Sequence, residues 1–380
     1  MHIKDVKARI ISNSRGEKTI EVVVNKKYRG SAPSGASTGR HEVASYSPGG
    51  VSSSVHFINR RAGLVGVELK DFSDLALFDS WLAEIGGNAV VALQSACLQA
   101  LSEGDIAPYL SGRLRFPIPL GNCIGGGAHT KLASTDIQEF LLIPQAKTFF
   151  ERAALNRYVY EMIGKFTLAK KKTDEGAFVL SKSNEEMFAF LSSLIEELDS
   201  YGIHLGFGVD MAASQFYSGG KYSYKNFSPS SKKKNLSSQG QITQVKQWIR
   251  DFGLAYVEDP LQEEDFRGYS QIQRKHTLVC GDDLVTTNLE RLKTALKYHS
   301  VNSIIVKPNQ IGSLVRTKEI VDFCKKKGIT TVLSHRSGET MDPLIAHLAA
   351  AWHVPYIKTG IFGKEREIKL QELIRLEKSS

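Results

Sequence analysis

Between residues 254 and 358 the chain repeats a short apolar run that stops at a charged or polar side chain: Leu254-Ala255-Tyr256-Val257-Glu258, Leu278-Val279-Cys280-Gly281-Asp282, Ile304-Ile305-Val306-Lys307, Thr331-Val332-Leu333-Ser334-His335 and Val354-Pro355-Tyr356-Ile357-Lys358. Successive end residues are separated by 23 (335 to 358) to 28 (307 to 335) positions. That length holds one strand, one helix and two loops, which is the size of a βα unit. Continuous apolar runs are typical of parallel strands that are buried on both faces.

Helical patterns fill the intervals between these strands. Asn288 is a typical N-cap, and Gly328 stands where a helix-ending glycine is expected. Residues 341–352 predict another helix, and residues 204–210 predict a strand that ends at Asp210. In a chain of 380 residues this alternation predicts a βα barrel, whose functional groups lie at the C-terminal strand ends. No glycine-rich phosphate loop follows a first strand, which argues against an open doubly wound sheet.

We therefore expect an α/β fold in which a smaller α+β domain, residues 1–112, precedes an eight-stranded barrel, residues 113–380. Residues 2–32 predict three antiparallel strands, and residues 51–110 are mostly helical in pattern. Between them lies the segment Pro33-Ser34-Gly35-Ala36-Ser37-Thr38-Gly39. Its small residues allow close approach to a ligand and its hydroxyls can bind a metal or a phosphate, although a plain surface loop has the same composition.

The barrel is expected to begin with a strand at residues 119–124 and a mobile, glycine-rich loop that ends at His129. The second strand contains Gln138-Glu139 and ends at Pro144. Ser183 with Glu186 forms the sequence of a capping box and predicts the start of a helix. The Ser- and Lys-rich residues 226–240 are expected to form a flexible insertion.

Composition excludes several classes of protein. No apolar run approaches the ~20 residues that span a membrane, and the polar segment after Met1 does not resemble a signal peptide. The four cysteines have no metal-type spacing, which favours free thiols in a reducing compartment. The net charge of +9 suits anionic partners, but the lysine runs at 170–172 and 232–234 lack interleaved aromatics. We expect no specific nucleic-acid binding.

The strand-end residues predict a metal site. Asp210, Glu258 and Asp282 end consecutive strands, and three carboxylates that meet in a barrel mouth repel one another unless a cation joins them. Hard oxygen ligands favour Mg²⁺. Lys307 and Lys358 end later strands, and a desolvated lysine near another cation has a lowered pKa and can act as a base.

An anion-binding segment, His335-Arg336-Ser337, follows the strand between the two lysines. An imidazole, a guanidinium fork and a hydroxyl are suited to hold a phosphate or a carboxylate. Together with the metal carboxylates and a lysine base, this clamp favours proton abstraction next to a carboxylate, with a divalent ion stabilising the negative charge that develops.

Seven longer motifs resemble those of enolase (phosphopyruvate hydratase): Ser34-Gly35-Ala36-Ser37-Thr38-Gly39, Gln138-Glu139-Phe140, Glu258-Asp259-Pro260, Gly281-Asp282-Asp283-Leu284, Lys307-Pro308-Asn309-Gln310-Ile311-Gly312, Ser334-His335-Arg336-Ser337-Gly338-Glu339-Thr340 and Lys358-Thr359-Gly360. The resemblance covers nearly the whole chain and is strongest from residue 204 onward. A lysine base with one or two Mg²⁺ ions is the arrangement known for the enolase superfamily.

The resemblance implies Mg²⁺-dependent, reversible dehydration of 2-phospho-D-glycerate to phosphoenolpyruvate in glycolysis and gluconeogenesis, by a cytoplasmic homodimer or larger homo-oligomer. It implies a role for each matching residue, which we give as a set. Asp210, Glu258 and Asp282 would bind one Mg²⁺, and Ser37 would help to bind a second Mg²⁺ and the substrate phosphate. Lys307 would be the base, and Glu175 would be the acid, with Glu139 as its partner. Lys358 would hold the substrate carboxylate, Arg336 and Ser337 would hold the phosphate, and His129, His335 and Gln138 would line the site.

The chain departs from the family pattern in its first domain and in its loops. The usual Asp-Ser-Arg-Gly-Asn-Pro-Thr becomes Asn13-Ser14-Arg15-Gly16-Glu17-Lys18-Thr19, and the usual Asp-Glu-Gly-Gly ends at Ala177. Asp174-Glu175-Gly176 is also common in surface turns, and His129 and Glu139 could have structural roles. Two rivals therefore stay open: an enzyme for a phosphonate or carboxyphosphate analogue of phosphoenolpyruvate, and a non-catalytic interaction protein on the same scaffold.

Overall fold

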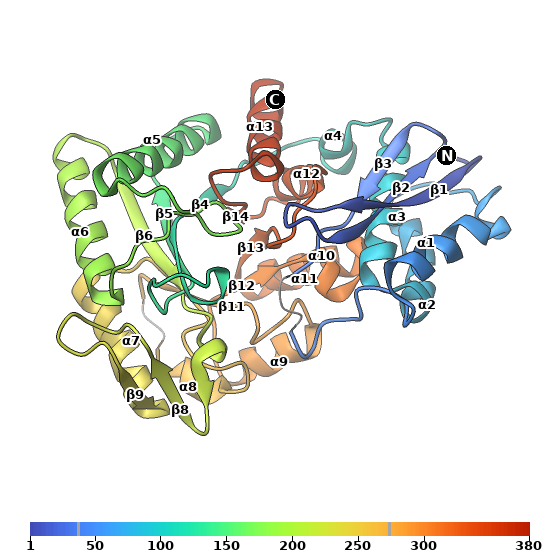
Figure 1. Cartoon of the computed structure of the whole chain (residues 1–380). Helices are drawn as coiled ribbons and strands as arrows, with labels where there is room; N and C mark the ends of the chain where they lie inside the picture. The colour runs from blue at the N-terminus through green and yellow to red at the C-terminus, as the bar shows by residue number, and fades with distance from the viewer. Residues whose placement is uncertain (36–38, 273–274) are drawn as a thin grey trace.

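The computed structural model describes residues 1–35, 39–272 and 275–380 (Figure 1). Three antiparallel strands open the chain as predicted: β1 (Val6–Ser12), β2 (Lys18–Val24) and β3 (Tyr28–Ser31). The inward face of β2 consists of Ile20, Val22 and Val24, which are fully buried. This alternation is the half-buried pattern that the sequence shows.

Helices cover this sheet, in agreement with the helical pattern of residues 51–110. They are α1 (Gly50–Arg60), the 3₁₀ helices η1 (Ala62–Leu64) and η2 (Phe72–Trp81), α2 (Leu82–Ile85), α3 (Gly87–Leu101) and α4 (Ile106–Leu110). Helix α3 is buried along almost its whole length, because it lies between the sheet and the second part of the chain. A Cβ at Gly30 of β3 would lie 2.4 Å from the Ala92 carbonyl oxygen, so only glycine permits this close packing.

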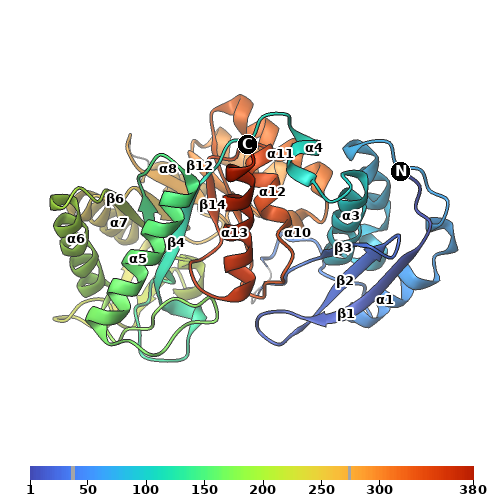
Figure 2. The ribbon, with the colours of Figure 1, turned by 90° about the horizontal axis from the view of Figure 1, so that it is seen from above.

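Eight strands then close into a barrel in the order β10-β11-β12-β13-β14-β4-β5-β6. Figure 2 shows the three-stranded sheet β1–β3 at one side of this barrel and α5 and α6 at the other. They are β4 (Ile118–Gly125), β5 (Glu139–Pro144), β6 (Leu205–Asp210), β10 (Tyr256–Glu258), β11 (Leu278–Gly281), β12 (Ser303–Val306), β13 (Thr330–Ser334) and β14 (Tyr356–Lys358). The predicted barrel is confirmed, but the expectation of parallel strands is wrong for β5, which is antiparallel to both β4 and β6. Between β4 and β5 the chain has only the short η3 (Gly127–His129) and no crossover helix, and a parallel pair needs a crossover.

Helices of different lengths surround the barrel: α5 (Phe149–Thr167), α6 (Asn184–Ser200), α7 (Ser238–Phe252), α8 (Phe266–Ser270), α9 (Leu289–Lys297), α10 (Pro308–Ile311), α11 (Leu314–Lys327), α12 (Leu344–Ala351) and α13 (Lys364–Lys378). The predicted caps are confirmed: Asn288 caps α9, Ser183 with Glu186 forms a capping box on α6, and Gly328 ends α11 in the left-handed conformation. The helix expected at 341–352 starts later, after Pro343.

The expected flexible insertion at 226–240 is wrong. Its second half forms β9 (Lys234–Ser237) and the start of α7, and β9 pairs with β8 (Lys221–Tyr224), which pairs with β7 (Tyr217–Ser218). Tyr222, Tyr224 and Phe227 are buried under this sheet. The aromatic anchors lie outside or at the edge of the polar stretch, so its own composition did not reveal them.

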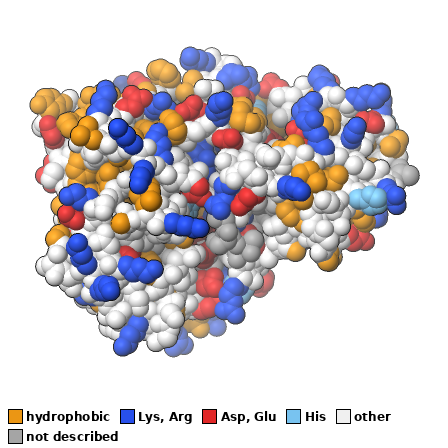
Figure 3. Space-filling view, in the orientation of Figure 1, with side chains coloured by type: hydrophobic (Ala, Val, Ile, Leu, Met, Phe, Trp, Pro, Cys, Tyr) orange, Lys and Arg blue, Asp and Glu red, His pale blue; other side chains and the backbone are white. Residues whose placement is uncertain are grey.

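Side chains fill the barrel interior, and its apolar core is formed by Leu120, Leu141, Ile143, Tyr256, Cys280, Ile305 and Val332. A Cβ at Gly208 would lie 2.4 Å from the Tyr256 carbonyl oxygen, so the glycine makes room for this strand. All four cysteines are free and buried. Among the described residues no helix has the length and apolar character to cross a bilayer. Basic side chains are spread over the face shown in Figure 3 among acidic and uncharged ones.

Candidate active site

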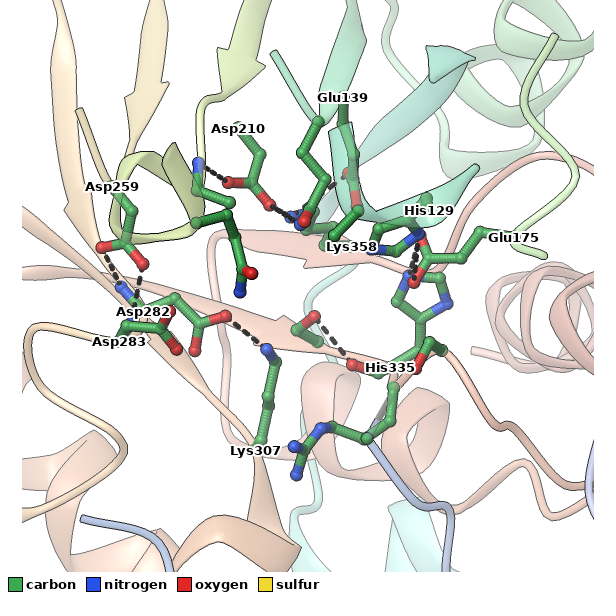
Figure 4. Close-up of a pocket in the computed structure, with 18 of the residues that line it drawn as sticks. His129, Glu139, Glu175, Asp210, Asp259, Asp282, Asp283, Lys307, His335 and Lys358 are labelled. Carbon is green, nitrogen blue, oxygen red and sulfur yellow. Dashed lines mark hydrogen bonds and ion pairs between the residues drawn. The ribbon is translucent and has the colours of Figure 1, made fainter. Parts of the chain in front are cut away.

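A cavity of about 270 Å³ lies at the C-terminal ends of the barrel strands (Figure 4). Predicted site residues from six strand ends line it or lie beside it, and the first domain contributes Arg15, Gly35 and Glu42 to its wall. The structure therefore brings together residues that are far apart in sequence, such as Arg15 and Lys358, in the barrel mouth that the sequence predicted. Ser37, the predicted ligand of a second metal ion and of phosphate, lies outside the described residues.

Lys358 lies at the centre of one carboxylate cluster. Its Nζ is 2.9 Å from Asp210 Oδ2, 3.0 Å from both oxygens of Glu258 and 3.2 Å from Glu139 Oε2. Burial lowers the pKa of Lys358, but the three carboxylates outweigh burial and raise it well above its usual value. Burial and the neighbouring Asp210 raise the pKa of Glu258 to about 8. Gln138 Nε2 donates to Asp210 Oδ2 at 3.2 Å.

Lys307 forms a second, separate ion pair with Asp282, and Gln310 Nε2 donates to the other oxygen of that carboxylate at 3.1 Å. The expected lowering of the lysine pKa is wrong for this arrangement. Burial does lower the pKa of Lys307, but the adjacent Asp282 charge outweighs burial and the repulsion from Arg336 and Lys358, and the net direction is upward. The same pairing holds the pKa of Asp282 below its usual value in spite of burial.

Sequence reasoning assigned no role to Asp259 and Asp283, which form an acidic group with the predicted ligand Asp282. Oxygens of Asp259, Asp282 and Asp283 lie within 4.8 Å of one another, close enough to share a cation. Asp259 accepts hydrogen bonds from the backbone of Asp282 (3.0 Å) and Asp283 (2.8 Å) and from the Tyr269 hydroxyl (2.9 Å), so its lone pairs are largely used. Burial and the adjacent Asp282 raise the pKa of Asp283 to about 7. The adjacent acidic pairs 258–259 and 282–283 were the available signal.

Three predicted catalytic residues, His129, Glu139 and Glu175, form another close group, within 4.8 Å of one another. Glu175 lies in a turn but is only 4% exposed, so the alternative that it is an ordinary surface residue is wrong. His129 Nδ1 lies 3.7 Å from Glu175 Oε1 and 3.0 Å from Asp174 Oδ1, and His335 Nε2 lies 3.5 Å from Glu175 Oε2.

The two glutamates of this group have opposite pKa shifts. Burial raises the pKa of Glu139 well above its usual value, although Lys358 opposes it. Burial acts on Glu175 in the same direction, but His129 and His335 outweigh it and hold the pKa of Glu175 well below its usual value. Burial lowers the pKa of His129, whereas Glu175 and its neighbours raise it to about 9. In this arrangement burial favours the protonated form of Glu139, and the two histidines favour the ionised form of Glu175.

Arg336 of the predicted anion clamp is already paired. Its two terminal nitrogens donate to the two oxygens of Glu42, both at 3.0 Å, and one of them also donates to Asn309 Oδ1 at 3.0 Å. Sequence reasoning missed Glu42, because nothing in the local sequence shows that it meets a residue 294 positions away. Ser337 follows Arg336 into the cavity wall, and burial lowers the pKa of His335 on the other side.

Comparisons with known proteins agree with this geometry. The family described as "Enolase, N-terminal domain" matches residues 3–109, and "Enolase, C-terminal TIM barrel domain" matches residues 113–379. The chain is 38% identical to the enolase of Methanothermobacter thermautotrophicus, with 99% of this chain and 96% of that protein covered. It is 39% identical to the enolase of Picrophilus torridus (99% and 98% covered) and 37% identical to that of Archaeoglobus fulgidus (99% and 97%). Since the matches run from one end of the chain to the other and include both domains, the chain belongs to the enolase family.

Proposed function

We propose that the described site dehydrates 2-phospho-D-glycerate to phosphoenolpyruvate, reversibly, with the residue roles given below. The activity itself is that of the family: the chain is a phosphopyruvate hydratase, a hydro-lyase of glycolysis and gluconeogenesis. The observation that carries it is similarity over the full length to enolases, in a chain whose barrel mouth holds buried lysines facing buried carboxylates.

A divalent metal ion belongs to this family's chemistry, and the donor set here fits one. Carboxylates crowd the strand ends, and two of them, Glu258 and Asp283, have raised pKa values because burial and the repulsion from neighbouring carboxylates both disfavour their charged forms. We propose two Mg²⁺ ions, one held by Asp210, Glu258 and Asp282 and one held with the help of Ser37. Bound cations would neutralise these carboxylates and the negative charge that develops on the substrate.

Lys307 is the proposed base that takes the C2 proton. Its burial and the nearby cationic side chains of Arg336 and Lys358 favour the neutral amine, whereas the pairing with Asp282 and, less strongly, the charge of Glu258 oppose it. Once the charge of Asp282 is matched by another cation, the remaining influences lower the lysine pKa. The basicity of Lys307 would therefore depend on whether a cation is bound beside Asp282.

The group formed by His129, Glu139 and Glu175 is the proposed acid that assists loss of the C3 hydroxyl. In Figure 4 this group and Lys307 come from different sides of the cavity, as removal of a proton and a hydroxyl from adjacent carbons requires. The opposite pKa shifts of the two glutamates favour Glu139 as the proton store and Glu175 as the residue that passes the proton on. Lys358 would hold the substrate carboxylate, Arg336 and Ser337 the phosphate, and His335 would line the site.

We further propose a cytoplasmic protein that forms a homodimer or a larger homo-oligomer, without specific nucleic-acid partners. The test of the activity is the ultraviolet absorbance of phosphoenolpyruvate after 2-phosphoglycerate is added to purified protein and Mg²⁺, with a chelator as control. A chelator-sensitive rise is the expected result. A flat trace from folded, Mg²⁺-binding protein would overturn the proposal and lead to assays with phosphonate and carboxyphosphate analogues.

A further inference from the structure

Helix α13 presents two charged side chains to the interior of the protein. Arg366 is 2% exposed and Lys369 is 1% exposed, three positions apart on the inward face of the helix. Buried charges are unfavourable unless they are paired and hydrogen-bonded, so both side chains need an explanation. None of the catalytic roles above uses either residue.

Both side chains end on the loop that carries the proposed phosphate clamp, residues 335–340. Lys369 Nζ lies 2.8 Å from Glu339 Oε2 and donates to the carbonyl oxygens of Thr340 (2.8 Å) and Glu365 (2.7 Å). An ammonium group has three donors, and here three acceptors face it. Arg366 Nη2 donates to the Ser337 carbonyl oxygen at 3.0 Å.

Glu339 transmits this anchoring to the clamp. Its Oε1 accepts the backbone N–H of Arg336 at 3.2 Å, and its Oε2 accepts the N–H of Thr340 at 3.0 Å. The carboxylate thus folds back over its own loop and fixes the backbone at both sides of Ser337. Burial alone would raise the pKa of Glu339, but Lys369 outweighs burial and keeps it low, so the carboxylate stays ionised and accepts these bonds.

The first domain holds the other side of the same loop. Ser14 Oγ donates to the Ser337 carbonyl oxygen at 3.1 Å and accepts the Glu339 N–H at 3.0 Å. Gly338 and Ser34 exchange two backbone hydrogen bonds, both 2.9 Å long. A Cβ at residue 338 would lie 2.3 Å from Asn13 Nδ2, so the loop has no space to shift toward the first domain.

We propose that Lys369 is a positioning residue for the phosphate clamp: its ion pair with Glu339 fixes the backbone of Arg336 and Ser337 in the orientation that binds the substrate phosphate. This inference rests on the proposed function, in which Arg336 and Ser337 bind that phosphate. A clamp that is ordered in advance does not lose conformational freedom on binding, so the anchor increases affinity for the anion without touching it.

The test replaces the anchor with an unbranched, uncharged side chain of similar size, in Lys369→Met. We expect the Mg²⁺-loaded variant to bind inorganic phosphate about tenfold more weakly by calorimetry, and its KM for 2-phosphoglycerate to rise about tenfold with a much smaller fall in kcat. Glu372→Gln is the matched control. It removes a carboxylate of the same helix that pairs with His347 at 3.2 Å and lies outside the clamp, so phosphate affinity and KM should stay at the wild-type values.

Since Lys369→Met leaves Glu339 buried without its partner, the variant could fail to fold, and Lys369→Met/Glu339→Gln then replaces it. The double variant carries no unpaired charge, and it should fold but still bind phosphate weakly. Wild-type phosphate affinity in either folded variant would overturn the inference, and so would equal changes in phosphate affinity for Lys369→Met and Glu372→Gln. Failure of the proposed function has a different signature, since it appears in the wild-type protein as absence of phosphoenolpyruvate.

Discussion

Tyr256→Phe removes one hydroxyl from the fully buried barrel core. That hydroxyl donates to Glu258 Oε2 at 2.7 Å, and the same oxygen lies 3.0 Å from Lys358 Nζ. A hydrogen bond contributes about 0.5–1.5 kcal/mol between neutral groups and about 1.5–3 kcal/mol when one group is charged, and the pKa of Glu258, about 8, places this bond between the two cases. We expect about 1.5 kcal/mol of lost stability, because Glu258 keeps Lys358 as a donor and phenylalanine leaves no polar atom without a partner.

The larger effect of Tyr256→Phe should be on metal binding. The hydroxyl orients a proposed Mg²⁺ ligand, and removal of such an orienting group costs roughly 10–100-fold in metal affinity. Urea unfolding of metal-free protein measures the stability, and calorimetric titration with Mg²⁺ measures the affinity. Tyr224→Phe is the matched control, since its buried hydroxyl donates to Gln241 Oε1 at 2.9 Å, away from the site. If Tyr256→Phe bound Mg²⁺ as tightly as Tyr224→Phe, the hydroxyl would have no part in orienting Glu258.

Three further predictions concern the site. Lys307→Ala should abolish exchange of the C2 proton of 2-phosphoglycerate with solvent while Mg²⁺ still binds. The control is Lys293→Ala, which changes an exposed lysine paired with Glu290. Exchange that persists in Lys307→Ala would refute the assignment of the base. Glu175→Gln should keep this C2 exchange, followed by NMR, but slow formation of phosphoenolpyruvate by roughly 10²–10⁴-fold, the usual contribution of an acid or base, and an equal loss of both reactions would contradict its role as the acid. Metal-free protein should lose stability as the pH rises from about 5 to about 8, because Asp283 (pKa about 7), Glu258 (about 8) and His129 (about 9) bind protons more tightly in the folded than in the unfolded chain. Each group contributes on the order of 1.4 kcal/mol per pH unit while it titrates, and saturating Mg²⁺ should flatten the slope in urea-denaturation curves; a rise in stability over this range would contradict the shifts.

The strand-end residues could be located from sequence because parallel strands of one barrel all present their C-terminal ends to one face. Asp210, Glu258, Asp282, Lys307, His335 and Lys358 therefore share a cavity or its edge, although their proposed roles stay predictions. The boundary between residues 112 and 113 also stays a prediction. The orientation of β5 was not accessible in the same way, because its direction depends on the connection from β4 and not on its own apolar pattern.

Contacts between distant parts of the chain were the main feature that the sequence did not predict. Glu42 pairs with Arg336 across 294 positions. Arg336 was predicted as part of the anion clamp, but Glu42 reads locally as an ordinary charged loop residue. The direction of the Lys307 pKa was wrong for a related reason, because it depends on which carboxylate lies nearest in space. Lys369 reads as a solvated lysine in an amphipathic helix, and only the three acceptors around its ammonium group distinguish it from one.

The hydrogen bonds of Ser14 to the clamp loop, which join residues 323 and 325 positions apart, limit how this protein can be recombined with its relatives. A chimera that takes the first domain from one enolase and the barrel from another would inherit each half of this contact from a different parent. The turn at residues 13–17 departs from the family pattern, and it lies against the loop that carries Arg336. The two segments should therefore be taken from the same parent, although they lie on opposite sides of the boundary between the domains.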